Sequence, residues 1–231
     1  MISIIIPSLN EEKYIEETLK SMKNQDFEGE YEIILVDGGS KDKTIKIAKK
    51  YTNNIIKIGR GISKARNRGA KESKGNILIF VDADTRLLYN TVSVIEKTFK
   101  KKEVVAATCP TVPGPAVKDF IPYWAFNVLM EKSIKSKKAK IPGWCFACRK
   151  SVFESLGGFD ESLSTGEDFD LSSKLSKKGK IVFMKETFSI TSPRRIRNWG
   201  LLNGTRKYIE TYIMNHIVKK NIDMEKYGII R

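Results

Sequence analysis

Two aspartates, Asp82 and Asp84, stand two positions apart directly after the continuous apolar run Ile77–Val81. Residues two apart on an extended chain point to the same side, so both carboxylates could face one ligand. Hard cations such as Mg²⁺ or Mn²⁺ take oxygen ligands and usually share them with phosphate groups. The spacing therefore predicts a divalent-metal site beside a diphosphate, and a turn capped by the two carboxylates is the alternative.

Polar residues also follow two other apolar runs of the sequence. Pro7, Asn10 and Glu11 end or follow the first run, and Asp37 ends the second. In open parallel sheets, ligands bind beyond the carboxyl ends of the strands. We therefore expect these side chains to meet the two aspartates at one edge of a sheet.

The elements that must position these residues alternate between two patterns in the first half of the chain. Short continuous apolar runs indicate strands covered on both faces, and periodic segments between them indicate helices. The predicted strands are Ile2–Pro7, Glu32–Asp37, Ile55–Ile58, Ile77–Asp82, Val104–Pro110, Trp144–Cys148, Ile181–Met184 and Phe188–Thr191. The predicted helices are Glu12–Lys23, Asp42–Tyr51, Ile62–Ser73, Thr91–Lys101, Lys118–Lys135, Ser151–Leu156 and Asp168–Lys178, with 111–115 as a loop.

The composition limits the class of protein. In 231 residues, 41% are hydrophobic and 30% charged, which predicts a folded α/β protein and not a disordered chain. The formal net charge of +15 favours an anionic partner, or serves solubility alone. Cys145 and Cys148 form a C-x-x-C pair, but no second Cys or His pair completes a zinc site, so we expect packing cysteines.

The sequence lacks the glycine motifs of two other kinds of nucleotide-binding site. The first strand leads into residues 8–11 without the G-x-G-x-x-G of a dinucleotide-binding fold, and no P-loop is present. A nucleotidyltransferase-like enzyme stays an alternative, although the chain has no glycine-rich basic loop after its first strand. A non-catalytic, basic nucleic-acid-binding protein is another alternative, supported by the charge but by no recognition motif.

Five segments together carry a specific resemblance. Ser3–Glu12, Glu32–Thr44, Ala65–Ala70, Gly157–Glu161 and Gly166–Leu171 resemble motifs of the family-2 glycosyltransferases. They occur in the family's order over about residues 1–195. Each motif is weak alone, and the ordered set is a strong signal.

The resemblance implies a fold and an activity. It implies a GT-A-type α/β fold with a mostly parallel central sheet flanked by helices, as a single domain 1–231. Residues 1–88 would form a Rossmann-like nucleotide-sugar half, 89–198 the acceptor half, and 199–231 a C-terminal helical tail. The implied enzyme is an inverting, Mg²⁺- or Mn²⁺-dependent hexosyltransferase of polysaccharide biosynthesis. It would use a nucleoside-diphosphate sugar and an unidentified glycan, small-molecule or lipid-phosphate acceptor.

The resemblance also implies roles for individual positions. The expected nucleotide-sugar-binding residues are Pro7, Asn10, Glu11, Asp37, Arg66, Asp82 and Asp84, with Asp37 facing the base, Arg66 near the diphosphate, and Asp82 and Asp84 holding ribose and metal. Asp168 matches the carboxylate that deprotonates the acceptor hydroxyl. An ordinary capping role at a helix N-terminus is the alternative for Asp168.

One departure from the family concerns the metal. Many relatives supply a late histidine, whereas the corresponding segment here is Thr191–Arg195 and His216 lies further on, in a predicted helix. Arg194 and Arg195 could bind diphosphate instead, because guanidinium forks match phosphate oxygens; a solvated basic loop is the alternative. Trp144 and Glu167 are further candidates for contacts to acceptor or diphosphate, and core packing is the alternative for Trp144.

Membrane contact is a separate hypothesis. The sequence has no apolar run of about 20 residues and no basic leader, which predicts a cytoplasmic protein. The apolar segment Lys118–Lys135, the basic run Ser133–Lys140 and the basic tail could dock peripherally on the cytoplasmic face of the membrane.

Overall fold

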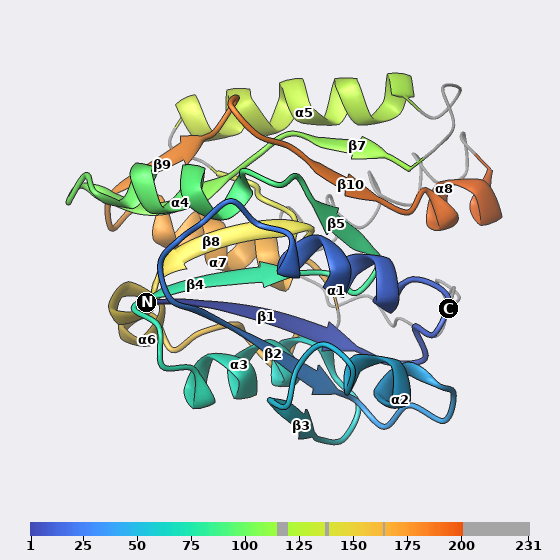
Figure 1. Cartoon of the computed structure of the whole chain (residues 1–231). Coiled ribbons are helices and arrows are strands. Elements are labelled where there is room, and N and C mark those ends of the chain that lie inside the picture. The colour runs from blue at the N-terminus through green and yellow to red at the C-terminus, as the bar shows by residue number, and fades with distance from the viewer. Residues whose placement is uncertain (115–119, 137–138, 164, 201–231) are drawn as a thin grey trace.

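The computed structural model describes residues 1–114, 120–136, 139–163 and 165–200, which alternate strands and helices from the N-terminus onward (Figure 1). The strands are β1 (Ile2–Ser8), β2 (Tyr31–Asp37), β3 (Ile55–Lys57), β4 (Ile77–Val81), β5 (Thr85–Leu87), β6 (Val104–Thr108), β7 (Thr111–Pro113), β8 (Cys145–Arg149), β9 (Lys180–Phe183) and β10 (Ser189–Thr191). The helices are α1 (Ile15–Lys23), α2 (Thr44–Ala48), α3 (Ile62–Glu72), α4 (Thr91–Phe99), α5 (Phe120–Lys135), α6 (Lys150–Ser155), α7 (Glu167–Leu175) and α8 (Arg194–Trp199).

A seven-stranded sheet in the order β3-β2-β1-β4-β8-β6-β9 forms the centre of the molecule. The pairs β3–β2, β2–β1, β1–β4 and β6–β9 are parallel, whereas β8 runs antiparallel to both of its neighbours, β4 and β6. Because β1, β2 and β4 are parallel neighbours, their carboxyl ends meet at one edge of the sheet. The sheet therefore brings the polar segments that follow these strands together.

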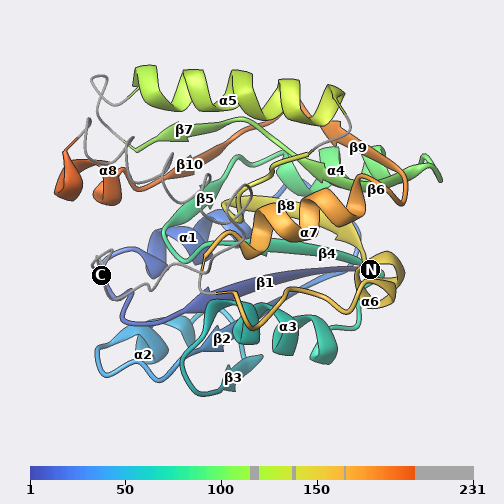
Figure 2. The ribbon, with the colours of Figure 1, turned by 180° about the vertical axis from the view of Figure 1, so that it is seen from behind.

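Both faces of this sheet are covered, which explains the continuous apolar runs in its strands. On β1, Ile4 and Ile6 pack with α1, α2 and α4, whereas Ile5 packs with α3, α6 and α7 on the other face. The two views of the ribbon show these helix groups on opposite faces of the sheet (Figures 1 and 2). Side chains that alternate across a strand thus belong to two separate cores.

A second, three-stranded sheet in the order β5-β10-β7 lies beside the main sheet. Strand β10 runs antiparallel to β5 and parallel to β7. Helix α5 contacts β7 and β9, and it forms the outermost layer on this side of the molecule in both views (Figures 1 and 2). The small sheet joins segments that lie up to about 100 residues apart in the sequence.

The prediction of an α/β fold with a mostly parallel central sheet flanked by helices is confirmed. The prediction of a loop at 111–115 is wrong for Thr111–Pro113, which form β7 by pairing with β10. The main sheet combines strands from residues 1–88 and 89–198, and the division into two halves stays a prediction. The predicted tail helix, with His216, lies outside the described residues apart from the end of α8 at 199 and residue 200.

Candidate active site

The loops that follow β1 and β2 are joined to each other by side-chain hydrogen bonds. The backbone N–H of Asn10 donates to Ser40 Oγ at 2.8 Å, and the N–H of Lys41 donates to Asn10 Oδ1 at 2.8 Å. The N–H of Glu11 donates to the hydroxyl of Thr44 at 2.7 Å. These bonds hold Asn10 and Glu11 at the carboxyl edge of the sheet. Asn10 adopts a positive φ of 54° there, which is uncommon for residues other than glycine.

Asp37 supports this pair of loops from inside the protein. Its side chain is fully buried and accepts hydrogen bonds from the N–H groups of Gly39, at 3.0 Å, and Ser40, at 2.9 Å. The hydroxyl of Ser40 donates to the other carboxylate oxygen. Asp37 therefore holds the turn, and its contact with a nucleotide base stays a prediction. Pro7 is likewise buried, inside β1 and opposite Val36 of β2.

Arg194, at the start of α8, connects the loop after β1 to the segment after β4 that contains Asp84. Its Nη1 and Nη2 donate to the two carboxylate oxygens of Glu11 at 2.6 and 2.7 Å. Its Nε lies 3.0 Å from Asp84 Oδ2 in an ion pair, and its guanidinium stacks over the Tyr14 ring. Arg194 thus places one positive charge between two carboxylates that come from distant parts of the sequence. The side chain of Arg195 is not among those described.

Arg66, on α3, makes a second connection deeper in the protein. Its Nη2 donates to Asp82 Oδ1 at 2.9 Å and its Nη1 donates to Glu167 Oε1 at 2.7 Å. The Arg66 guanidinium is buried and lies over the Phe159 ring, 5.2 Å from its centroid. Arg66 therefore links the segment after β4 to the first turn of α7, where Asp168 also lies.

Close packing around Arg66 requires a glycine at position 143. A Cβ atom at this position would overlap the Nη2 atom of Arg66. The Gly143 N–H also donates to Asp168 Oδ2 at 2.8 Å. The glycine thereby lets the backbone pass against a guanidinium and orient a carboxylate. The need for glycine at this position depends on the contact with Arg66, which lies 77 residues earlier in the sequence and gives no local signal.

Asp168 has the electrostatic properties of a general base. Its removal from water raises its pKa to about 7, and the neighbouring Glu167 carboxylate acts in the same direction. The Arg66 charge and the hydrogen bonds from the N–H groups of Gly143 and Phe169 oppose this increase. A carboxylate that titrates near neutral pH is well matched to accept a proton from a hydroxyl group.

Trp144 follows Gly143 and lies against the inner side of α5. Its ring centroid is 5.6 Å from that of Tyr123 and 5.1 Å from that of Phe126. Trp144 is partly exposed, so this aromatic cluster combines packing with an accessible surface near Asp168. Trp124, also on α5, points away from this cluster and is 58% exposed, so it does not pack in the core.

The carboxylates of the site fit a metal ion that shares its ligands with a substrate. The described residues contain no group of three or more His, Cys, Asp or Glu side chains placed to hold a metal ion alone. Asp82 and Asp84 supply two carboxylates, and Mg²⁺ is commonly bound by one or two carboxylates together with substrate phosphates. The donor set therefore fits a cation bridged to a diphosphate. The three cysteines are buried free thiols, as the packing interpretation predicted.

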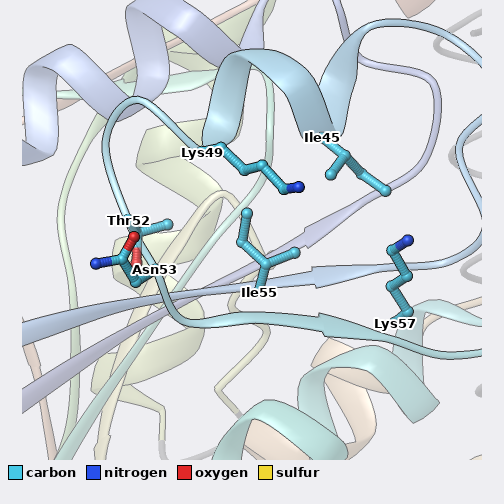
Figure 3. Close-up of a pocket in the computed structure, with 6 residues that line it drawn as sticks. All are labelled: Ile45, Lys49, Thr52, Asn53, Ile55 and Lys57. Atoms are coloured by element: carbon cyan, nitrogen blue, oxygen red, sulfur yellow. The ribbon is translucent and has the colours of Figure 1, made fainter.

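A separate pocket lies between α2 and the edge strand β3 (Figure 3). Its lining combines two lysines with apolar and small polar side chains: Ile45, Lys49, Thr52, Asn53, Ile55 and Lys57. None of the predicted site residues lines it. The predicted residues instead form two connected groups, Glu11–Arg194–Asp84 and Asp82–Arg66–Glu167 with Asp168. Tyr14, which stacks on Arg194, was missed because no sequence pattern distinguishes it from a core residue of α1.

Comparison with known sequences gives a consistent result. The sequence profile of "Glycosyl transferase family 2" matches residues 3–157. The Staphylococcus aureus poly(ribitol-phosphate) beta-N-acetylglucosaminyltransferase TarS is 40% identical over 90 residues, which are 36% of this chain and 16% of TarS. A Methanococcus voltae protein, named dolichyl N-acetyl-alpha-D-glucosaminyl phosphate 3-beta-D-2,3-diacetamido-2,3-dideoxy-beta-D-glucuronosyltransferase, is 28% identical over 92% of this chain and 70% of its own.

Solved structures share the fold. A mannosyltransferase from Pyrobaculum calidifontis, in complex with GDP-Man and Mn²⁺, superposes with a TM-score of 0.70 at 22% identity, over 90% of this chain and 64% of its own. TarS residues 1–349 in complex with UDP-GlcNAc superpose with a TM-score of 0.66 at 23% identity, over 82% of this chain and 58% of that one. The chain thus spans less than two thirds of the length of either structure.

Proposed function

Because the chain belongs to glycosyl transferase family 2, we propose that it transfers a sugar from a nucleoside-diphosphate sugar to an acceptor hydroxyl. The observation that carries this proposal is the connection of Asp168 to Asp82 through Arg66 and Glu167. Asp168, which is suited to removing a proton, lies at one end of this connection. Asp82, which together with Asp84 is suited to a diphosphate-bound cation, lies at the other end.

The proposed reaction is a displacement at the anomeric carbon with inversion. The acceptor oxygen forms a bond to this carbon while the bond from the carbon to the diphosphate oxygen breaks. Asp168 accepts the proton of the acceptor hydroxyl, and the electron pair of the broken bond leaves with the diphosphate. Mg²⁺ or Mn²⁺ held by Asp82 and Asp84 would neutralise charge on the leaving diphosphate.

The base favours a hydroxyl over a phosphate as the attacking group. A hydroxyl must lose a proton during attack, whereas a phosphate oxygen is already ionised at neutral pH and needs no base. The names of TarS and of the Methanococcus voltae relative both describe phosphate-containing acceptors. With a net charge of +15, the chain is suited to an acceptor that carries phosphate elsewhere in the molecule. We propose a glycan or lipid-linked saccharide of this kind, as in polysaccharide biosynthesis.

Nucleotide binding provides the first test. UDP, GDP and dTDP are titrated calorimetrically into the protein with and without Mn²⁺, and the titrations are repeated with Asp82→Asn/Asp84→Asn. We expect one nucleotide to bind in a Mn²⁺-dependent manner, and the double variant to lose at least tenfold in affinity. Asp170→Asn is the matched control, because Asp170 forms a separate pair with Lys174. Absence of binding by the folded protein to all three nucleotides would refute the proposed site.

Turnover provides the second test. With the sugar donor of the nucleotide identified above, release of nucleoside diphosphate is measured in the presence of saccharide acceptors. We expect Asp168→Asn to lower kcat by at least about 100-fold with nucleotide affinity unchanged. Asp170→Asn, on the same helix, should keep its activity. An active Asp168→Asn enzyme would remove Asp168 from the role of base.

A further inference from the structure

Helix α5 presents an apolar surface to the outside of the protein. Phe120, Ile121, Trp124 and Leu129 are 49%, 73%, 58% and 64% exposed. At about 100° per residue, these four side chains occupy about half of the helix circumference. The helix is the outermost layer on its side in both views (Figures 1 and 2). We call the surface formed by these four residues the outer face of α5.

The orientation of α5 is fixed by the opposite side of the helix. Tyr123 and Met130 are buried against the protein. The side-chain amide of Asn127 donates to the carbonyl oxygen of Thr111 at 2.8 Å, and its carbonyl oxygen accepts from the Thr111 N–H at 3.0 Å. Glu131, which points between Phe120 and Trp124 at the edge of the outer face, adds an ion pair with Lys185 of the segment after β9. Because these contacts lock the helix in place, the large apolar side chains of the outer face cannot turn inward.

We propose that the outer face of α5 docks on the surface of an anionic lipid bilayer. An interfacial helix of this kind buries an apolar face at the headgroup boundary and uses flanking lysines to bind anionic lipids. Lys132 is exposed and lies on the same face as Leu129, about one turn further along the helix. Lys135 is exposed at the end of the helix. In the sequence, lysines also follow at 137, 138 and 140, and the net charge is +15. The charge of the chain thus complements an anionic surface.

The geometry favours contact with the bilayer surface over crossing it. Helix α5 has 16 residues, and no helix among the described residues is long and apolar enough to cross a membrane. A helix lying in the interface keeps its locked inner side on the protein. That inner side contacts Trp144, which is adjacent to the Gly143–Asp168 hydrogen bond. Docking would therefore hold the acceptor side of the proposed site near the lipid surface, about one helix diameter away.

The test measures binding of the full chain to vesicles at low salt. Vesicles of phosphatidylcholine with about one third phosphatidylserine are compared with pure phosphatidylcholine vesicles in cosedimentation experiments. We expect the wild type to bind the anionic vesicles, and Ile121→Ser/Trp124→Ser/Leu129→Ser to bind at least tenfold more weakly. Tyr89→Ser is the matched control, since Tyr89 is 61% exposed but lies outside α5. Equal binding by the triple variant and the wild type would overturn the proposal.

Trp124 reports directly on the surface that makes contact. Vesicles should shift its fluorescence to shorter wavelength, and Trp124→Phe should keep vesicle binding while losing this shift. If residues 201–231 covered the outer face, Trp124 would be shielded from acrylamide before vesicles are added. If a second copy covered it, the triple variant would lower the molecular mass measured in solution. Either result, without vesicle binding by the wild type, would overturn the proposal. Neither depends on sugar transfer, so the proposed function is tested separately.

Discussion

Arg194 places a cation where the sequence predicts a metal ion. Its guanidinium bridges Glu11 and Asp84, two carboxylates that would otherwise repel each other at close range. A diphosphate with a divalent cation would bring its own positive charge to Asp84. The positive charge of Arg194 would then be available to the diphosphate, as proposed from the sequence. Arg194 and a metal ion would thus neutralise the same carboxylate at different stages of the proposed reaction.

Removal of Arg194 should make the protein dependent on a divalent cation. Arg194→Met leaves Glu11 and Asp84 without their nearly buried partner, and we expect a loss of about 3 kcal/mol in the free energy of unfolding. Millimolar Mn²⁺ should raise the Tm of this variant more than that of the wild type. Arg68→Met, which breaks an exposed pair with Glu72, should lose less than about 0.5 kcal/mol and show no such response. An equal Mn²⁺ response in both variants would contradict this interpretation.

Asp168 should make stability depend on pH in an unusual direction. Its pKa is raised to about 7 in the folded protein, whereas an unfolded aspartate titrates near its ordinary value of about 3.9. Between these values the folded state binds more protons than the unfolded state, so this group lowers stability as pH rises. Its full stabilising effect is present below pH 4 and is lost above pH 7.

The difference between Asp168→Asn and the wild type isolates this effect. The Tm of the variant minus that of the wild type should increase between pH 5 and pH 8, because only the wild type must ionise a dehydrated carboxylate. Asp170→Asn, which breaks an ion pair with Lys174 on the same helix, is the matched control measured over the same range. A Tm difference that stays constant with pH would show that Asp168 is not perturbed in the folded protein.

At the scale of elements, the segment before β8 has to pass closely against α3. Gly143→Ala introduces a methyl group that overlaps the Arg66 guanidinium, and we expect a loss of about 3 kcal/mol in the free energy of unfolding. The same change should displace the N–H that orients Asp168. Gly59→Ala is the control, since a Cβ there meets no atom within 4 Å. Denaturant unfolding of both variants provides the measurement, and equal stabilities would contradict close packing between position 143 and Arg66.

The elements that the sequence predicts well are those with purely local signals. Strands β1, β2 and β4 are continuous apolar runs, and the positions of Asp82 and Asp84 follow directly from the end of β4. Strand β7 was predicted as a loop because its three residues become a strand only by pairing with β10, about 80 residues away. Helix α8 was not predicted, because its basic residues have no apolar periodicity. The outer face of α5 also required the structure, because the sequence does not show which apolar side chains turn outward.

In the site, too, the positions of residues could be predicted from local sequence, whereas contacts between residues far apart in the sequence could not. The family resemblance implied roles for Asp82, Asp84, Asp168 and Arg194 in one site, and these roles stay predictions. In the structure Asp82 pairs with Arg66, Asp84 pairs with Arg194, and Asp168 follows Glu167, the other partner of Arg66. The actual partners of each charge could not be predicted, because pairs such as Arg66 and Glu167 lie 101 residues apart. For Asp37, the apolar run of β2 predicted its position at the strand end, whereas its hydrogen bonds to the N–H groups of Gly39 and Ser40 were not predicted.

At the scale of the whole molecule, Arg66 electrically couples the two ends of the proposed reaction. It is the buried partner of Asp82 at the carboxyl edge of the sheet and of Glu167 beside Asp168. Its charge also lowers the pKa of Asp168 against the effects of dehydration and Glu167. A change at position 66 should therefore alter both the stability of the protein and the pH at which the base becomes active.

Two substitutions at this position separate charge from shape. Arg66→Met removes the charge, so we expect the pKa of Asp168 to rise further and the midpoint of the pH–rate profile to move above pH 7. It should also cost about 3–5 kcal/mol of unfolding free energy, because two carboxylates lose their buried partner. Arg66→Lys keeps the charge but cannot hold both carboxylates as a planar fork does, so it should lose stability with its midpoint still near pH 7. Because a merely structural role would leave the midpoint unchanged in both variants, identical pH–rate profiles would show that Arg66 does not tune the base.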